Sequence, residues 1–217
     1  MKRQGYLIEK IADYENLLWA YWKAKRGKNT KSDVLLYNQH LQSNLKQLQT
    51  NILKGTCEIG HYHFFKIYES KERQICAASF SERVLHHAIM NVCHTSFENF
   101  QVFDSYATRQ CKGTYASIDR AMQFQKKYSY FMKIDCKKYF DSIDHTILKN
   151  QLNRRFKDEK LLHLLYQIID SYEVTSNKGL PIGNLTSQYF ANHYLAHADH
   201  YVSETLKIPA MVRYMDD

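Results

Sequence analysis

Apolar residues recur every three to four positions over most of this chain, a period that is typical of helices with one buried face. Ser32 is well suited to cap the second predicted helix, and Gly55 is placed to end it. Asp144 stands before His145 as a candidate N-cap of a later helix. The helices predicted from this period cover residues 7–26, 32–53, 81–97, 114–126, 144–155, 159–170 and 185–206.

Alternation of apolar and polar residues replaces the helical period over residues 62–77, which predicts a two-stranded ribbon. Two short apolar runs, Tyr130–Ile134 and Ile208–Val212, predict further strands, the second of them buried. Short strands that lie far apart among many helices favour an α+β fold over a regular βαβ array. The two Pro and seven Gly do not cluster, so no flexible linker is expected.

Carboxylates follow both of the later apolar runs: Asp135 follows the first, and Asp216 and Asp217 follow the second. Adjacent carboxylates repel each other and usually need a cation beside them. If the two strands are neighbours, these side chains converge at one rim of the sheet. Two Mg²⁺ ions about 3.5–4 Å apart would then be shared with substrate phosphates, to activate an attacking hydroxyl and stabilise a leaving pyrophosphate. Each aspartate taken alone is better explained as a strand-end cap or turn residue.

Two further features are candidates for binding a nucleotide. Lys66 and Arg73 lie seven residues apart on opposite arms of the predicted ribbon, where a point charge and a planar guanidinium would clamp a triphosphate. In isolation, two exposed ribbon cations are the simpler interpretation. The segment Gly179–Gln188 predicts a glycine-containing turn that opens a helix, and exposed backbone there can approach a nucleotide or template base. An ordinary helix N-terminus explains the same residues.

The charge balance narrows the class of partner. A formal net charge of +8 favours polyanions, meaning nucleic acid or, less often, an anionic membrane surface. Seventeen Tyr and eleven Phe suit base stacking, although core packing explains them equally well. Five widely spaced Cys without a C-x-x-C pair indicate neither a zinc site nor disulfides, and fit a cytoplasmic location. No apolar stretch reaches the length of a membrane span, and no secretory signal is recognised.

Three histidines at positions i, i+4 and i+7 of the last predicted helix would place metal ligands on one face: His193, His197 and His200. No H-E-x-x-H pattern accompanies them, so an ordinary polar helix face is the preferred interpretation.

Together and in this order, these residues resemble the fingers and palm of a reverse transcriptase. Ile134–His145 resembles the first catalytic-carboxylate motif of bacterial reverse transcriptases, and Tyr214–Asp217, a Y-x-D-D tetrapeptide, resembles the second. The resemblance implies that the catalytic, metal-binding residues are Asp135, Asp216 and Asp217.

The same resemblance implies contacts with the incoming nucleotide. Lys66 and Arg73 would hold its triphosphate. Phe140, five residues after the first catalytic aspartate, would be the steric gate that excludes a 2′-hydroxyl. Ile182 and Gly183 would lie against the nucleotide or the template base.

Three stretches are most similar to reverse transcriptases of diversity-generating retroelements: Arg83–Ala88, Asp104–Arg109 with Lys112–Thr114, and Leu180–Gln188. Group II intron enzymes usually carry Gln where Ile182 stands, and Ser-Pro in place of Ser187-Gln188. A branched alkyl group cannot make the hydrogen bond that an amide can, so the resemblance implies lowered fidelity. The residues expected to contact nucleic acid are Arg109, Lys112 and Gln188.

The resemblance therefore implies an RNA-directed DNA polymerase of α+β fold, with right-hand fingers, a partial palm and no thumb. It divides the chain into an N-terminal helical extension (1–60), fingers (61–128) and a palm with part of the fingers (129–217), truncated after the tetrapeptide. It implies two Mg²⁺ ions, with Mn²⁺ as a substitute. The expected partners are dNTPs, an RNA template, a DNA or RNA primer and a small basic accessory protein, without a membrane.

Two alternatives stay open. The first is a reverse transcriptase of the group II intron or retron type. The second is an RNA-binding module without polymerase activity, since residues that follow the tetrapeptide in the family are absent from this sequence.

Overall fold

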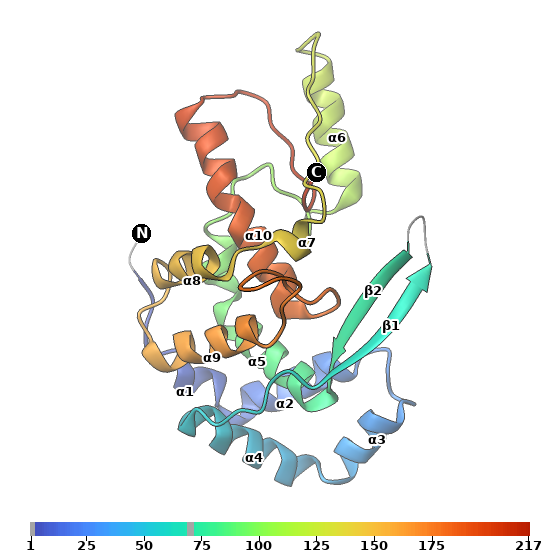
Figure 1. Ribbon diagram of the computed structural model, residues 1–217, viewed down its shortest axis with the longest axis vertical. Helices are drawn as coiled ribbons and strands as arrows, with labels where there is room; N and C mark the ends of the chain where they lie inside the picture. The colour runs from blue at the N-terminus through green and yellow to red at the C-terminus, as the bar shows by residue number, and fades with distance from the viewer. Residues whose placement is uncertain (1–2, 69–71) are drawn as a thin grey trace.

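The computed structural model describes residues 3–68 and 72–217, which form ten α-helices and one two-stranded ribbon (Figure 1). A π-helical stretch, Tyr201–Thr205, continues the last α-helix. The helices are α1 Ile8–Ile11, α2 Tyr14–Lys25, α3 Ser32–Gln39, α4 Leu41–Lys54, α5 Phe80–Glu98, α6 Thr114–Gln125, α7 Tyr139–Ser142, α8 His145–Asn153, α9 Glu159–Asp170 and α10 Leu185–His200. The strands are β1 Tyr62–Tyr68 and β2 Glu72–Ala78. The expected helix-rich α+β fold with a small antiparallel sheet is confirmed.

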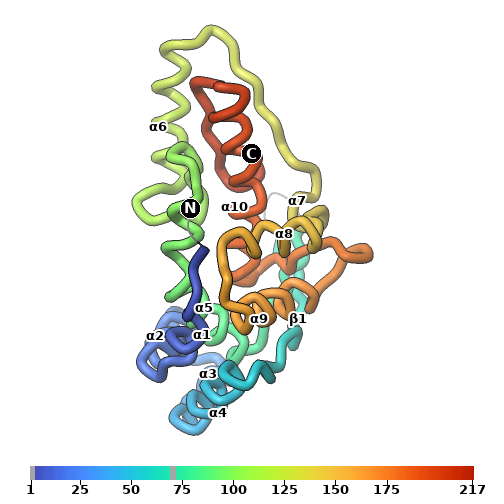
Figure 2. The backbone as a smooth tube through the Cα atoms, turned by 90° about the vertical axis from the view of Figure 1, so that its left-hand side faces the viewer, coloured from blue at the N-terminus to red at the C-terminus, as the bar shows by residue number. Residues whose placement is uncertain are grey.

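Helix α5 is the centre of the packing, with α1, α2, α3 and α10 against it. One hydrophobic core runs from Leu7 in the N-terminal segment to Ala191 in α10. It therefore crosses residues 60 and 128, where the sequence predicts domain boundaries. That division into extension, fingers and palm stays a prediction. Helix α6 and the end of α10 stand at the end of the molecule opposite to α3 and α4 (Figures 1 and 2).

The helical period predicts most helices correctly but misses two breaks. Asp13 accepts hydrogen bonds from the backbone N–H groups of Glu15 and Asn16, so a new helix begins there and the predicted helix 7–26 is divided. The predicted helix 32–53 is divided at His40. Gly55 ends α4 with a φ of 71°, as expected of a left-handed C-cap.

The two predicted strands beside the carboxylates are wrong. Residues 130–135 and 208–212 are irregular. Phe131 is 94% exposed and Ile208 is 46% exposed, whereas Met211 and Val212 are half-buried. A strand needs a hydrogen-bonded partner, and the pattern of one segment does not supply it. Among the described residues, the strand-like pairing of this region is the isolated bridge of Ser105 with Arg213.

Candidate active site

The tetrapeptide forms a tight turn. The Tyr214 N–H donates to the Asp217 carbonyl (2.9 Å), and the Asp217 N–H donates to the Tyr214 carbonyl (3.2 Å). Met215 within it has a left-handed φ of 57°. The turn therefore presents Asp216 and Asp217 next to each other at the surface.

The segment around Asp135 lies against this turn. The backbone N–H of Cys136 donates to the Asp216 carbonyl (3.3 Å), and the Lys133 ammonium pairs with Asp217 (3.0 Å). The pKa of Lys133 is raised by its hydrogen bond to Asp217 and by that charge, with a smaller contribution from Asp135. Burial raises the pKa of the Cys136 thiol, and Asp216 and Asp135 add to the effect. The two predicted carboxylate segments are thus neighbours, although neither is a strand.

The donor chemistry at this place fits magnesium, because carboxylate oxygens are among the protein ligands that bind it. The Lys133 ammonium against Asp217 shows that a positive charge is accommodated here. Within residues 3–68 and 72–217, however, no three His, Cys, Asp or Glu side chains lie close enough together to hold a metal ion. The assignment of Asp135, Asp216 and Asp217 as metal ligands stays a prediction.

The glycine turn lies beside α7. The Leu180 N–H donates to the Phe140 carbonyl (2.9 Å), and the Gly179 N–H donates to the Ile143 carbonyl (3.0 Å). Phe140 is half-buried, and its neighbour Tyr139 is anchored to α10 through a hydrogen bond from its hydroxyl to the Ala191 carbonyl (2.6 Å). The structure therefore brings Phe140 close to the turn that carries two further predicted nucleotide contacts, Ile182 and Gly183.

This turn also holds the outer edge of β2. The Ile182 carbonyl accepts from the Cys76 N–H (2.7 Å), and the Asn184 side-chain oxygen accepts from the Ala78 N–H (3.1 Å). Gly183 has a φ of 120°, and a Cβ there would lie 2.8 Å from Cγ2 of Ile75. Glycine is needed because the turn and the ribbon approach so closely. Sequence reasoning assigned Ile182 and Gly183 to the nucleotide and missed this role in attaching the ribbon.

The ribbon places Lys66 and Arg73 on opposite faces. Lys66 is paired with Gln74, and Arg73 with Ile67. Directly paired residues share a face and successive residues alternate, so the two cations point away from each other. Lys66 also forms an ion pair with Glu72 (2.7 Å). The structure thus places the two cations on opposite faces, which their spacing in the sequence does not reveal. Their joint contact with a triphosphate stays a prediction, as does a separate contact by each cation.

Arg109 has internal partners in the structure, and its predicted contact with nucleic acid stays a prediction. Its guanidinium donates to the Glu98 carboxylate (2.7 Å) and to the carbonyls of Val102 (2.6 Å) and Ser105 (2.7 Å). These bonds fold the loop after α5 onto itself. A basic residue in sequence does not reveal that its partners are internal.

The other two predicted nucleic-acid contacts lie on different elements. The Lys112 ammonium donates to the Phe103 carbonyl (2.7 Å) and lies 3.6 Å from the centre of the Phe103 ring. Burial lowers the pKa of Lys112. Gln188 is half-buried in the first turn of α10. Their contacts with nucleic acid stay predictions.

The histidine face of α10 is mostly a packing surface. His193 is fully buried, with ring centroids 5.4 Å from Phe97 and 5.1 Å from Phe100, and burial lowers its pKa to about 3. His197 and His200 each lie 4.7 Å from Phe100 by the same measure. The expected polar helix face is therefore wrong at His193, which packs as an aromatic ring.

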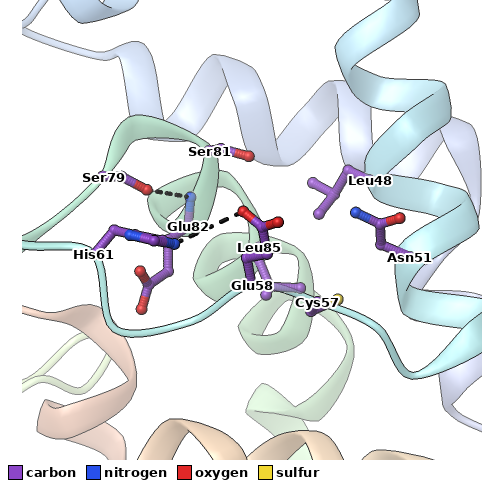
Figure 3. A pocket seen from close by; sticks show the side chains of 9 residues that line it. All are labelled: Leu48, Asn51, Cys57, Glu58, His61, Ser79, Ser81, Glu82 and Leu85. Atoms are coloured by element: carbon purple, nitrogen blue, oxygen red, sulfur yellow. Dashed lines mark hydrogen bonds and ion pairs between the residues drawn. The ribbon is translucent and has the colours of Figure 1, made fainter. Parts of the chain in front are cut away.

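A cavity of about 120 Å³ lies among α4, the 57–61 segment and the start of α5 (Figure 3). Helix α4 lies at the end of the molecule away from the C-terminal carboxylates (Figure 1). The buried Glu82 carboxylate at its wall accepts from the Gly60 N–H (3.2 Å), and burial raises the pKa of Glu82. Glu82 thus fixes the backbone that leads into β1. The residues that line the cavity include none of the predicted site residues.

The structure thus combines three features: carboxylates at a tight turn, a second carboxylate segment beside that turn, and a glycine turn joined to a ribbon. This arrangement is expected of the fingers and palm of a polymerase. The chain belongs to the reverse transcriptase (RNA-dependent DNA polymerase) family, whose sequence model matches residues 52–217.

Particular relatives are distant in sequence. The COX1/OXI3 intron 2 protein of Saccharomyces cerevisiae is 23% identical over 209 residues, covering 90% of this chain and 24% of that protein. The group II intron-encoded protein LtrA of Lactococcus lactis subsp. cremoris is 22% identical over 171 residues, covering 74% and 28%. The chain thus spans about a quarter of the length of these relatives.

Solved structures confirm the fold. A chain of a partial Cas6-RT-Cas1–Cas2 complex matches with a TM-score of 0.57 at 17% identity, over 97% of this chain and 37% of that chain. In the described part of the sequence, no helix is both long and apolar enough to cross a membrane.

Proposed function

We propose that this chain carries the nucleotide-addition centre of an RNA-directed DNA polymerase, which extends a DNA or RNA primer with dNTPs on an RNA template. The observation that carries the proposal is the contact of the two carboxylate segments, from Cys136 N–H to the Asp216 carbonyl (3.3 Å). Family membership supports the same activity. A net charge of +8 favours binding of a polyanionic template.

The carboxylates are the proposed magnesium ligands. Bound Mg²⁺ would neutralise phosphate charge and favour ionisation of the attacking 3′-hydroxyl. Asp135, Asp216 and Asp217 provide the negative charge that holds such an ion at the surface of the turn. Lys133 is positioned to neutralise Asp217 before an ion arrives, because its ammonium already lies 3.0 Å from that carboxylate.

The residues around the glycine turn are proposed to choose the nucleotide. The Phe140 ring excludes a 2′-hydroxyl by occupying the space that this hydroxyl would need. The hydrogen bond from the Leu180 N–H to the Phe140 carbonyl holds Phe140 beside the turn. Lys66 and Arg73 each contact phosphate from a different face of the ribbon. Ile182 presents a side chain without a hydrogen-bonding group, which lowers discrimination between bases.

The proposed subtype is that of a diversity-generating retroelement, on the basis of Ile182-Gly183 and Ser187-Gln188. Replacement of Ile182 with Gln in the full-length protein should change the misincorporation spectrum. An unchanged spectrum would contradict this assignment. The second candidate is an intron-encoded enzyme, which the similarity to LtrA favours. A small basic accessory protein is the expected partner of the first subtype.

Primer extension by the full-length protein on an RNA template with Mg²⁺ tests the activity. The wild type should extend the primer, Asp216→Ala should lose extension, and Asp119→Ala should retain it because Asp119 is exposed on α6. RNA binding is measured in parallel by filter retention. A wild type that binds RNA but extends nothing would support the RNA-binding module instead.

A further inference from the structure

Arg213, the residue before the tetrapeptide, is buried and bonded on every side. It is 7% exposed, and its guanidinium pairs with the buried Asp199 carboxylate through Nε (2.9 Å) and Nη2 (2.8 Å). Nη1 donates to the Asn192 side-chain oxygen (3.1 Å), and Nη2 donates to the Ser105 hydroxyl (3.0 Å). Both Asp199 and Asn192 belong to α10.

The backbone of Arg213 is held as firmly as its side chain. Its N–H donates to the Asp104 carbonyl (2.9 Å), and its carbonyl accepts from the Tyr106 N–H (2.9 Å). The residue is therefore clamped between the 104–106 segment and α10. These bonds fix the backbone at the point where the chain enters the turn.

One bond of this network reaches the turn itself. Nη1 of Arg213 donates to the carbonyl of Met215 (2.6 Å), which belongs to the peptide bond that precedes Asp216. Met215 has a φ of 57°, a backbone conformation that residues other than glycine rarely adopt. The bond from Arg213 compensates for that disfavoured conformation and fixes the direction in which the next carboxylates leave the backbone.

A purely structural ion pair would anchor the chain to α10 without the bond to Met215. Buried ion pairs add little net stability, because the cost of desolvation offsets the attraction. The network instead satisfies a carbonyl inside the turn that carries the carboxylates. The network therefore supports the turn from which the two carboxylates extend.

We propose that Arg213, oriented by Asp199, is a positioning residue that sets the placement of Asp216 and Asp217. This inference rests on the proposed polymerase function. It adds a role for α10, which begins directly after the turn at Gly183 and reaches Arg213 through Asp199. One rigid helix therefore connects the predicted nucleotide turn to the carboxylate turn.

The test compares Arg213→Lys and Asp199→Asn with wild type in the full-length protein. Lysine keeps the charge but cannot reach Asp199 and the Met215 carbonyl together, because its ammonium lacks the guanidinium fork. We expect kcat for primer extension to fall about 10²-fold while KM for dNTP changes little, as for misplaced reacting groups. The Mg²⁺ concentration for half-maximal extension should rise roughly tenfold or more, as when residues behind metal ligands are changed.

Binding of Mn²⁺, measured by electron paramagnetic resonance without substrates, provides a readout other than activity. The affinity of the protein for Mn²⁺ should fall in both variants by roughly the same factor by which the Mg²⁺ concentration for half-maximal extension rises. Arg83→Lys is the matched control, because Arg83 forms an arginine–aspartate pair with Asp33 (2.6 Å) at the other end of the molecule. This control should leave extension and Mn²⁺ binding unchanged.

Thermal melting separates positioning from folding. Folded Arg213→Lys protein with wild-type Mn²⁺ affinity and Mg²⁺ requirement would overturn the inference, and so would a loss confined to the melting temperature. If Arg213→Lys does not fold, Asp199→Asn, which keeps one acceptor oxygen, decides by the same measurements. A wild type that binds Mn²⁺ without extending a primer contradicts the polymerase function alone. A wild type that does neither contradicts both.

Discussion

The end of the molecule formed by α1–α5 and α9 differs in construction from the end that carries the carboxylates. The first is a continuous core whose leucines, isoleucines and aromatics are almost completely buried. At the second, α6 buries only Ser117, and the irregular segment after it exposes Tyr130 and Phe131. The carboxylate turn is held by a few polar bonds, chiefly those of Arg213. Stability and site geometry therefore depend on different residues.

The strongest test of this difference removes one buried and one exposed leucine. Leu165→Ala in α9 should lower the free energy of unfolding by about 2–5 kcal/mol, because Leu165 is completely buried and a cavity remains. Leu206→Ala, at the carboxylate end, should cost less than about 1 kcal/mol, since that side chain is half exposed. Urea unfolding of both variants measures the two values. Equal losses would show that the two ends share one core.

The same difference explains which predictions from sequence succeed. Helix α9 spans the predicted residues 159–170, because its hydrogen bonds and its apolar face are local. The break at Asp13 depends on side-chain capping, and the break at His40 on a non-helical backbone conformation, and the apolar period predicts neither. The strands predicted before Asp135 and Asp216 fail because pairing requires a second segment.

In the candidate site too, local features are predicted from sequence and features that depend on a second segment are not. The types and order of its carboxylates are readable from sequence, and so is the turn at Gly183. The faces of Lys66 and Arg73 depend on the register of the ribbon, which spacing does not set. The internal roles of Arg109 and Arg213 depend on which partners the fold brings to them, such as Glu98 for the former and Ser105 for the latter, and residue type does not reveal these. An arginine directly before the tetrapeptide was the one available signal for Arg213.

The attachment of the ribbon to the glycine turn can be weakened at Gly183. Gly183→Ala should destabilise the protein by about 1–3 kcal/mol, because the new Cβ would lie 2.8 Å from Ile75 and the φ is 120°. Hydrogen exchange should show faster exchange of the Cys76 amide, which loses its bond to Ile182. Gly27→Ala is the matched control, since Gly27 also has positive φ (73°) but no heavy atom within 4 Å of the added carbon. Equal costs would mean that backbone strain alone, and not contact with the ribbon, requires glycine.

The buried histidine of α10 makes stability depend on pH. Burial lowers the pKa of His193 to about 3, against roughly 6.5 in the unfolded chain, so the unfolded state binds the extra proton between these values. This contribution is complete above pH 6.5 and is lost as the pH falls toward 3. His193→Phe, which packs among Phe97 and Phe100, should reduce the loss of stability between pH 7 and pH 5 by up to about 2 kcal/mol. Urea unfolding of wild type and variant at pH 7 and pH 5 measures this loss. If the variant loses as much stability between the two pH values as wild type does, the burial of a neutral His193 is contradicted.

The smallest effect is expected at the carboxylate end, where Lys133 and Asp217 are both exposed. Lys133→Ala should leave the urea midpoint unchanged, because an exposed ion pair contributes little to folding. It should strengthen Mn²⁺ binding by a factor of at most about five, since the ammonium no longer competes for Asp217. Lys137→Ala, at a nearby exposed position of the same segment, should change neither. Weaker Mn²⁺ binding in Lys133→Ala would mean that Lys133 supports the carboxylates. Lys133 would then join Arg213 among the residues that set the site geometry without contributing to stability.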